Sequence, residues 1–350
     1  MTSTRLHPAD GTVPRNASRP APDPSSPTGP QMMNRSFLRS IGAQNISLLI
    51  ALAALLVIFG ALRPDVFFTP RNLVNIGLSI TILGLLAMAQ TIVIVSGGLD
   101  ISVGSVVGLT TMVVAVATNA VDSISAGIAC GLLAGIVAGL INGAIIVYGP
   151  VNAVIATLGT MSAFRGLAYI VNNGNSISIP SDELRALGVG TIFGLPIAIW
   201  LLLLVMVLFI LFTKKTVVGR NIYAIGGNST VARLAGIPIK RYQLGIYALS
   251  GASAAVAGLI LAARTLSGQP ASGSQGLELE AITAAILGGC ALAGGKGTIV
   301  GAMLGVLIIG VLNNGMILTS VPTFYQLLAK GALLVAAVII QERQRARSGE

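Results

Sequence analysis

The chain has 350 residues, of which 54% are apolar and only 9% are charged, whereas an ordinary soluble domain has about 25% charged residues. So few charges cannot cover the surface of a soluble fold of this length, which excludes that class. The 43 glycines favour closely packed membrane helices. A net charge of +10 suggests nucleic acid as a partner, but the positions of the basic residues, given below, argue against one.

The two ends of the chain differ in composition from its centre. Residues 1–40 include the run RPAPDPSSPTGP, and we expect them to form a disordered tail because they offer no apolar core. The first apolar run begins only near Ile46, too late for a secretory signal peptide, so we predict a retained membrane helix there. Residues 342–350 predict a short basic tail, which leaves 41–341 as the transmembrane domain.

Ten apolar runs follow one another, each of roughly the 17–25 residues that a spanning helix needs. They are continuous rather than alternating, which favours helices over a β-barrel. The predicted fold class is therefore all-α, a polytopic integral membrane protein with about ten transmembrane helices. The expected segments are 46–62, 73–95, 99–117, 124–148, 152–172, 194–212, 242–263, 277–293, 296–313 and 323–340. The divisions within 73–117 and 277–313 stay open, because either run can hold a broken helix or a re-entrant segment.

Basic residues in short loops predict the orientation of the chain. With an even number of spans, the two ends and the longest loop share one side, while the opposite loops hold only Arg63, Arg71, Arg185 and Arg264. The residues of the richer side are Arg35, Arg39, Lys214, Lys215, Arg220, Arg233, Lys240, Arg241, Lys296, Arg343, Arg345 and Arg347. Both termini should therefore be cytoplasmic, and the positive charge suits an anionic membrane face without any nucleic acid.

Gly97, Gly98 and Asp100 mark a candidate helix break between the second and third segments. An ionisable group at membrane depth suggests a functional site. Carboxylates also suit helix N-termini, and we favour the interpretation that Asp100 caps the next helix. In both cases we expect the loss of Asp100 to damage the protein.

Other charged residues fall within or beside apolar runs. Glu278 and Glu280 suggest either cation-coupling carboxylates or, as we favour, a helix start near the outer surface. Arg165 lies near the outer end of its span, where its side chain can reach the interface. Lys330 is more central, so we expect it to face protein or water.

Several side-chain amides lie within or beside the apolar runs. Gln90, Asn142, Asn152 and Asn314 are candidates for lining a translocation path, because amides offer hydrogen bonds without carrying charge, although for each residue we favour hydrogen bonding between helices. The polar connector 172–190 is long enough to contact a partner protein, or it is an ordinary solvated loop.

The longest cytoplasmic loop, 213–241, contains a short predicted helix with TVARLA at its centre. Asn228 or Ser229 is a suitable N-cap, and Gly236 with Pro238 ends the helix. Such a helix between two spans can dock in a groove of a cytoplasmic partner and move the flanking helices. It can also simply lie on lipid headgroups.

Four stretches in this order resemble the sugar-importing ABC permeases of the ribose, xylose, arabinose and galactose type. GRNIYAIGGNSTVARLAGIPI resembles the ATPase-docking loop of that family, and the resemblance covers about residues 45–340. The other three stretches are VSGGLDISVGSVVGL, NAVIATLGTMSAFRGLAYIVNNG and AAILGGCALAGGKGTIVGAMLG. By resemblance, the docking loop contains Gly226, Gly227, Ala232, Arg233, Ala235 and Gly236.

The resemblance implies an inner-membrane permease that pairs with a second copy or a paralogue. Cytoplasmic ATP-binding subunits dock on the loop helix, and a periplasmic binding protein delivers a monosaccharide. The family implies no cofactor and no catalytic residue in this chain. In agreement, GGKGT at 294–298 does not complete the phosphate-binding pattern GxxxxGK[ST], so ATP hydrolysis must occur on another chain.

Three alternatives are weighed against this function. A permease for branched-chain amino acids belongs to a related family, but the sequence of the docking loop resembles that of the sugar permeases and favours a sugar. An ion-coupled secondary transporter places acidic groups near the bilayer midplane, whereas the acids here lie at segment ends. A membrane enzyme or metal site needs a convergent cluster, yet the one histidine is His7 in the tail and there is no CxxC pattern.

Overall fold

The computed structural model describes the backbone of residues 31–149 and 151–348, and the side chains of 45–149, 151–339 and 341–343. The chain divides into two units, Met1–Gly42 and Ala43–Glu350, and the second holds the transmembrane domain. His7 and most of the predicted N-terminal tail lie outside the described residues. Residues 31–40, which the composition assigned to that tail, are helical, because a run of helix-forming residues without Pro or Gly starts at Gln31.

Helices make up nearly all of the described fold. In chain order they are α1 (Gln31–Leu62), α2 (Pro64–Phe67), α3 (Pro70–Val95), α4 (Val103–Val121), α5 (Ile124–Tyr148), α6 (Ala153–Ile170), α7 (Asp182–Val189), α8 (Ile197–Lys215), α9 (Val217–Gly227), α10 (Ser229–Leu234), α11 (Ile239–Thr265), α12 (Leu277–Leu287), α13 (Ile299–Leu318) and α14 (Thr323–Ser348). Within the described ranges, nine of these are long and apolar enough to cross a membrane. Nine of the ten expected segments therefore form a helix of spanning length, and the polytopic all-α prediction is confirmed.

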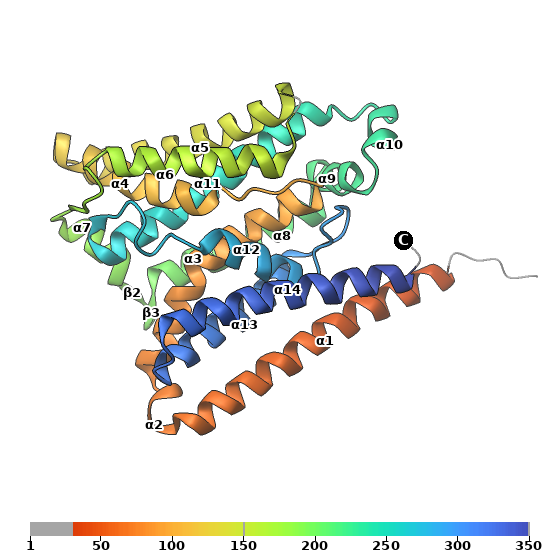
Figure 1. Ribbon diagram of the computed structural model, residues 1–350, viewed down its shortest axis with the longest axis horizontal. Helices are drawn as coiled ribbons and strands as arrows, with labels where there is room; N and C mark the ends of the chain where they lie inside the picture. The colour runs from red at the N-terminus through yellow and green to blue at the C-terminus, as the bar shows by residue number, and fades with distance from the viewer. Residues whose placement is uncertain (1–30, 150, 349–350) are drawn as a thin grey trace, which may run out of the picture. The chain divides into compact units, whose positions relative to one another are not determined.

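Helices α3 and α11 lie at the centre of the second unit. Of their most apolar stretches 83% and 72% are buried, against 6% for α14. Helix α11 packs against α3, α4 and α5, and it lies between α3 and the α4–α5 pair (Figure 1). Glycines allow the contact between α5 and α11, since a Cβ atom on Gly139 would lie 2.2 Å from the carbonyl oxygen of Tyr247.

The run 73–117 contains two spanning helices, α3 and α4, joined by the non-helical residues 96–102. The run 277–313 is different, because α12 has only 11 residues. A helix of that length rises ~16 Å, about half of the hydrocarbon core. The expected helix 277–293 is therefore wrong in extent, since Gly288, Gly289 and the glycine-rich residues after them end it early.

The segment between α11 and α12, residues 266–276, runs along α4 as a short extended stretch followed by turns. The hydroxyl of Thr111 donates to the carbonyl of Gln269 at 2.8 Å and accepts from its N–H at 2.9 Å. Further along, a Cβ on Gly108 would lie 2.4 Å from the carbonyl oxygen of Pro270. The stretch is therefore attached to α4 before it enters α12.

Small structures cover the end of the helices away from α9 and α10 (Figure 1). Strand β1 (Ile177–Ser178) pairs antiparallel with β4 (Ser267–Gly268), which attaches the connector 172–190 to the extended stretch. Strands β2 (Thr191–Ile192) and β3 (Leu195–Pro196) form a hairpin with Phe193 and Gly194 at its tip. Phe193 is 93% exposed there.

Candidate functional site

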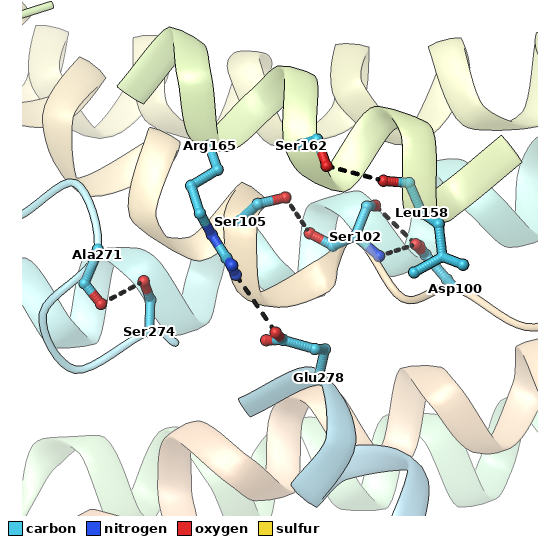
Figure 2. A network of polar contacts seen from close by, with 9 residues as sticks. All are labelled: Asp100, Ser102, Ser105, Leu158, Ser162, Arg165, Ala271, Ser274 and Glu278. Atoms are coloured by element: carbon cyan, nitrogen blue, oxygen red, sulfur yellow. Dashed lines mark hydrogen bonds and ion pairs between the residues drawn. The ribbon is translucent and has the colours of Figure 1, made fainter. Parts of the chain in front are cut away.

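Asp100 lies at the centre of a buried polar cluster and is 1% exposed. Its Oδ1 accepts from the backbone N–H of Ser102 at 3.0 Å and from the hydroxyl of Ser102 at 2.7 Å. Its Oδ2 accepts from the hydroxyl of Ser250 on α11 at 2.7 Å. Asn142 on α5 donates to the Ser102 hydroxyl at 2.7 Å. Ser102 is the N-cap residue of α4, so Asp100 binds the residue at which that helix starts, whereas α4 has no side-chain cap hydrogen bond (Figure 2).

The non-helical segment 96–102 needs partners for its backbone, since a buried carbonyl without one is costly. Tyr247 and Thr157 donate to the carbonyl of Leu99 at 3.3 and 3.4 Å. Gln90 donates to the carbonyl of Asp100 at 2.7 Å. Side chains from three helices therefore replace the missing helical hydrogen bonds.

The cluster lies well inside the helices rather than at their ends. Gln90 is five residues before the end of α3, Asn142 six before the end of α5, and Ser250 eleven after the start of α11. These separations correspond to ~8–16 Å along the helices. Asp100 is thus an ionisable group buried within the helices that binds Ser102, the N-cap residue of α4, so the role of a direct helix cap stays a prediction.

Two ion pairs hold the start of α12. Arg165 on α6 contacts Glu278 at 3.3 Å, and Lys330 on α14 contacts Glu280 at 2.6 Å. Figure 2 shows the Arg165 side chain pointing toward Glu278. Asn313 also donates to Glu280, at 3.1 Å. Both glutamates occupy the first turn of α12, as expected, but Glu278 is only 6% exposed.

The starts of α12 and α4 meet at this point. A Cβ on Gly104 would lie 2.0 Å from Oε2 of Glu278 and 2.9 Å from the carbonyl of Ser274. Arg165 therefore has a partner inside the protein, which corrects the expectation that it extends to the membrane interface. Sequence reasoning missed both ion pairs, because their members are 113 and 50 residues apart along the chain.

The four candidate path residues lie in three different places. Gln90 and Asn142 meet around Asp100, and each keeps a buried side-chain oxygen without a hydrogen-bond partner among the described residues. Asn314 exchanges hydrogen bonds of 2.8 and 3.0 Å with Asn72, which joins α13 to α3. Asn152 is the exposed N-cap of α6 and accepts from the next turn.

The loop 213–241 forms two helices, α9 and α10, of which the sequence predicted only the second. Asn228 is the N-cap of α10, and its Oδ1 accepts from the N–H of Val231 at 3.0 Å. Gly236 has a φ of 80°, and the N–H of Ile237 bonds to the carbonyl of Ala232 at 3.1 Å. This is a Schellman ending, which explains why a glycine stands there.

The residues of the predicted docking loop differ in exposure. Gly227, Arg233, Ala235 and Gly236 are exposed, whereas Ala232 is buried. Two large apolar side chains on α10 are also exposed, Val231 at 60% and Leu234 at 84%. They are three residues apart and so lie on one face of the helix. These two residues were not among the candidates, although their helical spacing could have identified them.

Gly226 belongs to a close backbone contact that we call the glycine junction, formed by Val95, Gly97, Gly226, Gly294 and Gly295. The N–H of Gly295 donates to the carbonyl of Val95 at 2.8 Å. A Cβ on Gly226 would lie 1.7 Å from that same carbonyl oxygen, and one on Gly294 would lie 3.1 Å from the Cα of Gly97. The junction joins the end of α9 to the turn after α3 and to the turn before α13.

Tyr223 on α9 adds a side-chain bond beside the junction. Its hydroxyl donates to the carbonyl of Gly297 at 2.8 Å. Burial, together with the neighbouring Cys290, raises the pKa of the Tyr223 phenol to about 12, so the hydroxyl keeps its proton at neutral pH. Within the part of the chain that the structure describes, no group of three His, Cys, Asp or Glu side chains could hold a metal ion.

Known proteins resemble this chain over most of its length. A family model described as the permease component of branched-chain amino acid transport systems matches residues 72–338. The L-arabinose transport system permease of Escherichia coli is 42% identical over 301 residues, covering 86% of this chain and 91% of that protein. The ribose import permease of Bacillus subtilis is 42% identical over 306 residues, covering 87% and 94%. No solved structure matches the chain. The chain therefore belongs to the family of ABC importer permeases that includes these arabinose and ribose permeases.

Proposed function

We propose that this chain is the membrane subunit of an ATP-driven importer for a monosaccharide. The observation that carries the proposal is identity of 42% with an arabinose and a ribose permease over at least 86% of the chain. The family model is named for branched-chain amino acids, but these nearly full-length relatives are sugar permeases, which favours a sugar. ABC permeases work with ATPase and substrate-binding partners, which supply the energy and the specificity.

The exposed face of α10 is proposed as the docking site for the ATPase. Val231 and Leu234 present an apolar patch beside the exposed Arg233, and a helix with such a face fits a groove on a partner. Ala232 and Gly226 are proposed to hold the loop in place rather than to contact the ATPase. Ala232 anchors α10, and Gly226 keeps α9 in contact with the transmembrane helices.

The glycine junction is proposed as the route by which ATPase closure reaches the transmembrane helices. Movement of α9 displaces the turn after Val95, which leads into 96–102 and the start of α4. It also displaces the turn at Gly294, which lies between α12 and α13. A single movement of α9 therefore reaches the helices on both sides of the contact between α4 and α12. Alternation between two packings of the transmembrane helices requires such a coupled movement.

The sugar is proposed to pass near the point where α4 and α12 begin. Helix N-termini there offer N–H groups to hydroxyl oxygens, and the free side-chain oxygens of Gln90 and Asn142 suit hydroxyl donors. Asn314, whose amide is already paired with Asn72, fits a structural role better. Asn152 lies at an exposed helix end and also fits that role.

Transport driven by an ion gradient is less well supported than transport driven by ATP. The reason is not the one suggested by the sequence, which was that the acids lie at the ends of segments. Asp100 and Glu278 are buried rather than placed at the surface, so the position of the acids does not argue against coupling. The partners of the acids argue against coupling, because Arg165 neutralises Glu278 and four hydrogen-bond donors contact the Asp100 carboxylate. Membership of the ABC family supports ATP as the energy source.

We also propose an inner-membrane location with both termini in the cytoplasm, as the basic loop 213–241 favours. The connector 172–190 and the β2–β3 hairpin then face the periplasm. Because Phe193 is exposed at the hairpin tip, this end is proposed to receive the binding protein.

The test is uptake into proteoliposomes that hold this permease, its ATPase subunit and a binding protein loaded with ribose or arabinose. We expect ATP-dependent uptake, and we expect Leu234→Asp to abolish both uptake and co-purification of the ATPase. Leu187→Asp, on exposed α7 at the other end, is the matched control and should leave ATPase binding unchanged. Full coupled uptake by Leu234→Asp would refute the docking assignment, and uptake by the permease alone would refute the ATP-driven function.

A further inference from the structure

An apolar groove opens between α8, α9 and α11 at the cytoplasmic end of the helices. Its volume is about 460 Å³, within the ~300–1,000 Å³ range of ligand pockets. Phe212 from α8, Ile222 from α9, and Ile246 and Leu249 from α11 supply its wall, and Arg241 is the charged residue that lines it. The groove belongs neither to the α10 face nor to the polar cluster around Asp100.

The groove runs from the end of the loop toward the middle of α11. Arg241 is near the start of that helix, and Leu249 is ten residues after its first residue, Ile239. Ten residues of helix rise ~15 Å, which is half of the hydrocarbon core. Since α11 is a membrane span, the inner part of the groove lies beside acyl chains, where a water-soluble ATPase cannot reach.

The charges around the mouth of the groove have one sign. Arg241 is exposed and lines the groove, and no acidic residue occurs between 212 and 249. The other basic residues of the flanking helix ends and loop are Lys214, Lys215, Arg220, Arg233 and Lys240. An apolar slot in the bilayer with basic residues at the headgroup level is complementary to an anionic lipid.

We propose that this groove binds one anionic phospholipid of the cytoplasmic leaflet. An acyl chain lies along α11 between Phe212 and Leu249, and the phosphate contacts Arg241. A second permease copy fits less well, because covering Arg241 with apolar surface would leave its charge without solvent or partner. The bound lipid fills the space between the loop helix α9 and the span α11.

Lipid binding is measured on the purified full-length permease by native mass spectrometry after exchange into phosphatidylcholine nanodiscs with added palmitoyl-oleoyl-phosphatidylglycerol. Gly245→Leu fills the groove at a position where an added Cβ meets no atom within 4 Å, so it should fold normally. Gly159→Leu on α6 has the same free space outside the groove and is its control. Arg241→Gln tests the headgroup contact, with Arg185→Gln at the opposite end as its control.

The expected result is one retained phosphatidylglycerol per chain, lost in Gly245→Leu and kept in both controls. Arg241→Gln should weaken retention about fivefold, equivalent to ~1 kcal/mol for one basic residue near the surface. Equal retention of phosphatidylcholine, or full retention in Gly245→Leu, would overturn the proposal. If Gly245→Leu instead releases the ATPase or separates two permease copies while lipid retention is unchanged, the groove holds that partner and the proposal also fails.

Discussion

Replacing Gly226 by alanine tests the glycine junction directly. The new Cβ would lie 1.7 Å from the carbonyl oxygen of Val95 and 2.7 Å from the N–H nitrogen of Gly295. Nonbonded atoms of this kind stay about 3 Å or more apart, so one of the turns must move by more than ~1 Å. Overpacking costs about 1–3 kcal/mol, and loss of the Gly295–Val95 hydrogen bond adds ~0.5–1.5 kcal/mol. We therefore expect a destabilisation of about 2–4 kcal/mol.

Gly227→Ala is the matched control, because an added Cβ there meets no atom within 4 Å. The measurement is the thermal unfolding temperature of each purified variant in detergent, together with ATPase activity in the assembled transporter. We expect Gly226→Ala to unfold several degrees earlier and to lose coupling between ATP hydrolysis and uptake, while Gly227→Ala keeps the unfolding temperature of the wild type. Equal unfolding temperatures for the two variants would show that the close backbone contact is absent.

Three further perturbations address the interior. Thr111→Val leaves the N–H and carbonyl of Gln269 unpaired, so we expect a loss of ~1–3 kcal/mol per group and easier proteolysis of 266–276; unchanged protease resistance would contradict the contact. Asp100→Leu removes the acceptor for four donors and should lower the unfolding temperature far more than Asp100→Asn, and equal effects would argue against these hydrogen bonds. In a double-mutant cycle, Glu278→Ala and Arg165→Ala should couple by about 1–3 kcal/mol in detergent stability, whereas additive effects would rule out the ion pair.

The membrane-spanning helices could be predicted from the sequence because the length of an apolar run is a local property of the chain. The segment 124–148 coincides with α5, and 73–95 misses only the first turn of α3, where Thr69 and Pro70 begin the helix. The predicted tail 1–40 differs from the structure at residues 31–40, which belong to α1, because composition alone does not distinguish the extension of a helix from an unstructured tail. The length of α12 was predicted wrongly because 277–293 is apolar enough to span a membrane, and only the glycines from Gly288 onward end the helix.

In the candidate site, too, the sequence predicted the local features but not the contacts between distant helices. The capping of α10 by Asn228 and its ending at Gly236 depend on residues within ten positions of each other, so the sequence predicted them. The contacts of Asp100 come from α3, α5 and α11, and the ion pair of Glu278 comes from α6. No pattern along one chain shows which distant helices meet, so the sequence could list these residues but could not pair them.

The shortness of α12 has a consequence for biogenesis. A segment of 11 residues with two glutamates is a poor substrate for insertion by the translocon on its own. Glu278 and Glu280 become tolerable in lipid only when Arg165 and Lys330 are beside them, and Lys330 belongs to the last helix to be synthesised. This crossing should therefore settle only after translation of the whole domain is complete, so truncation before α14 should leave α12 outside the bilayer core.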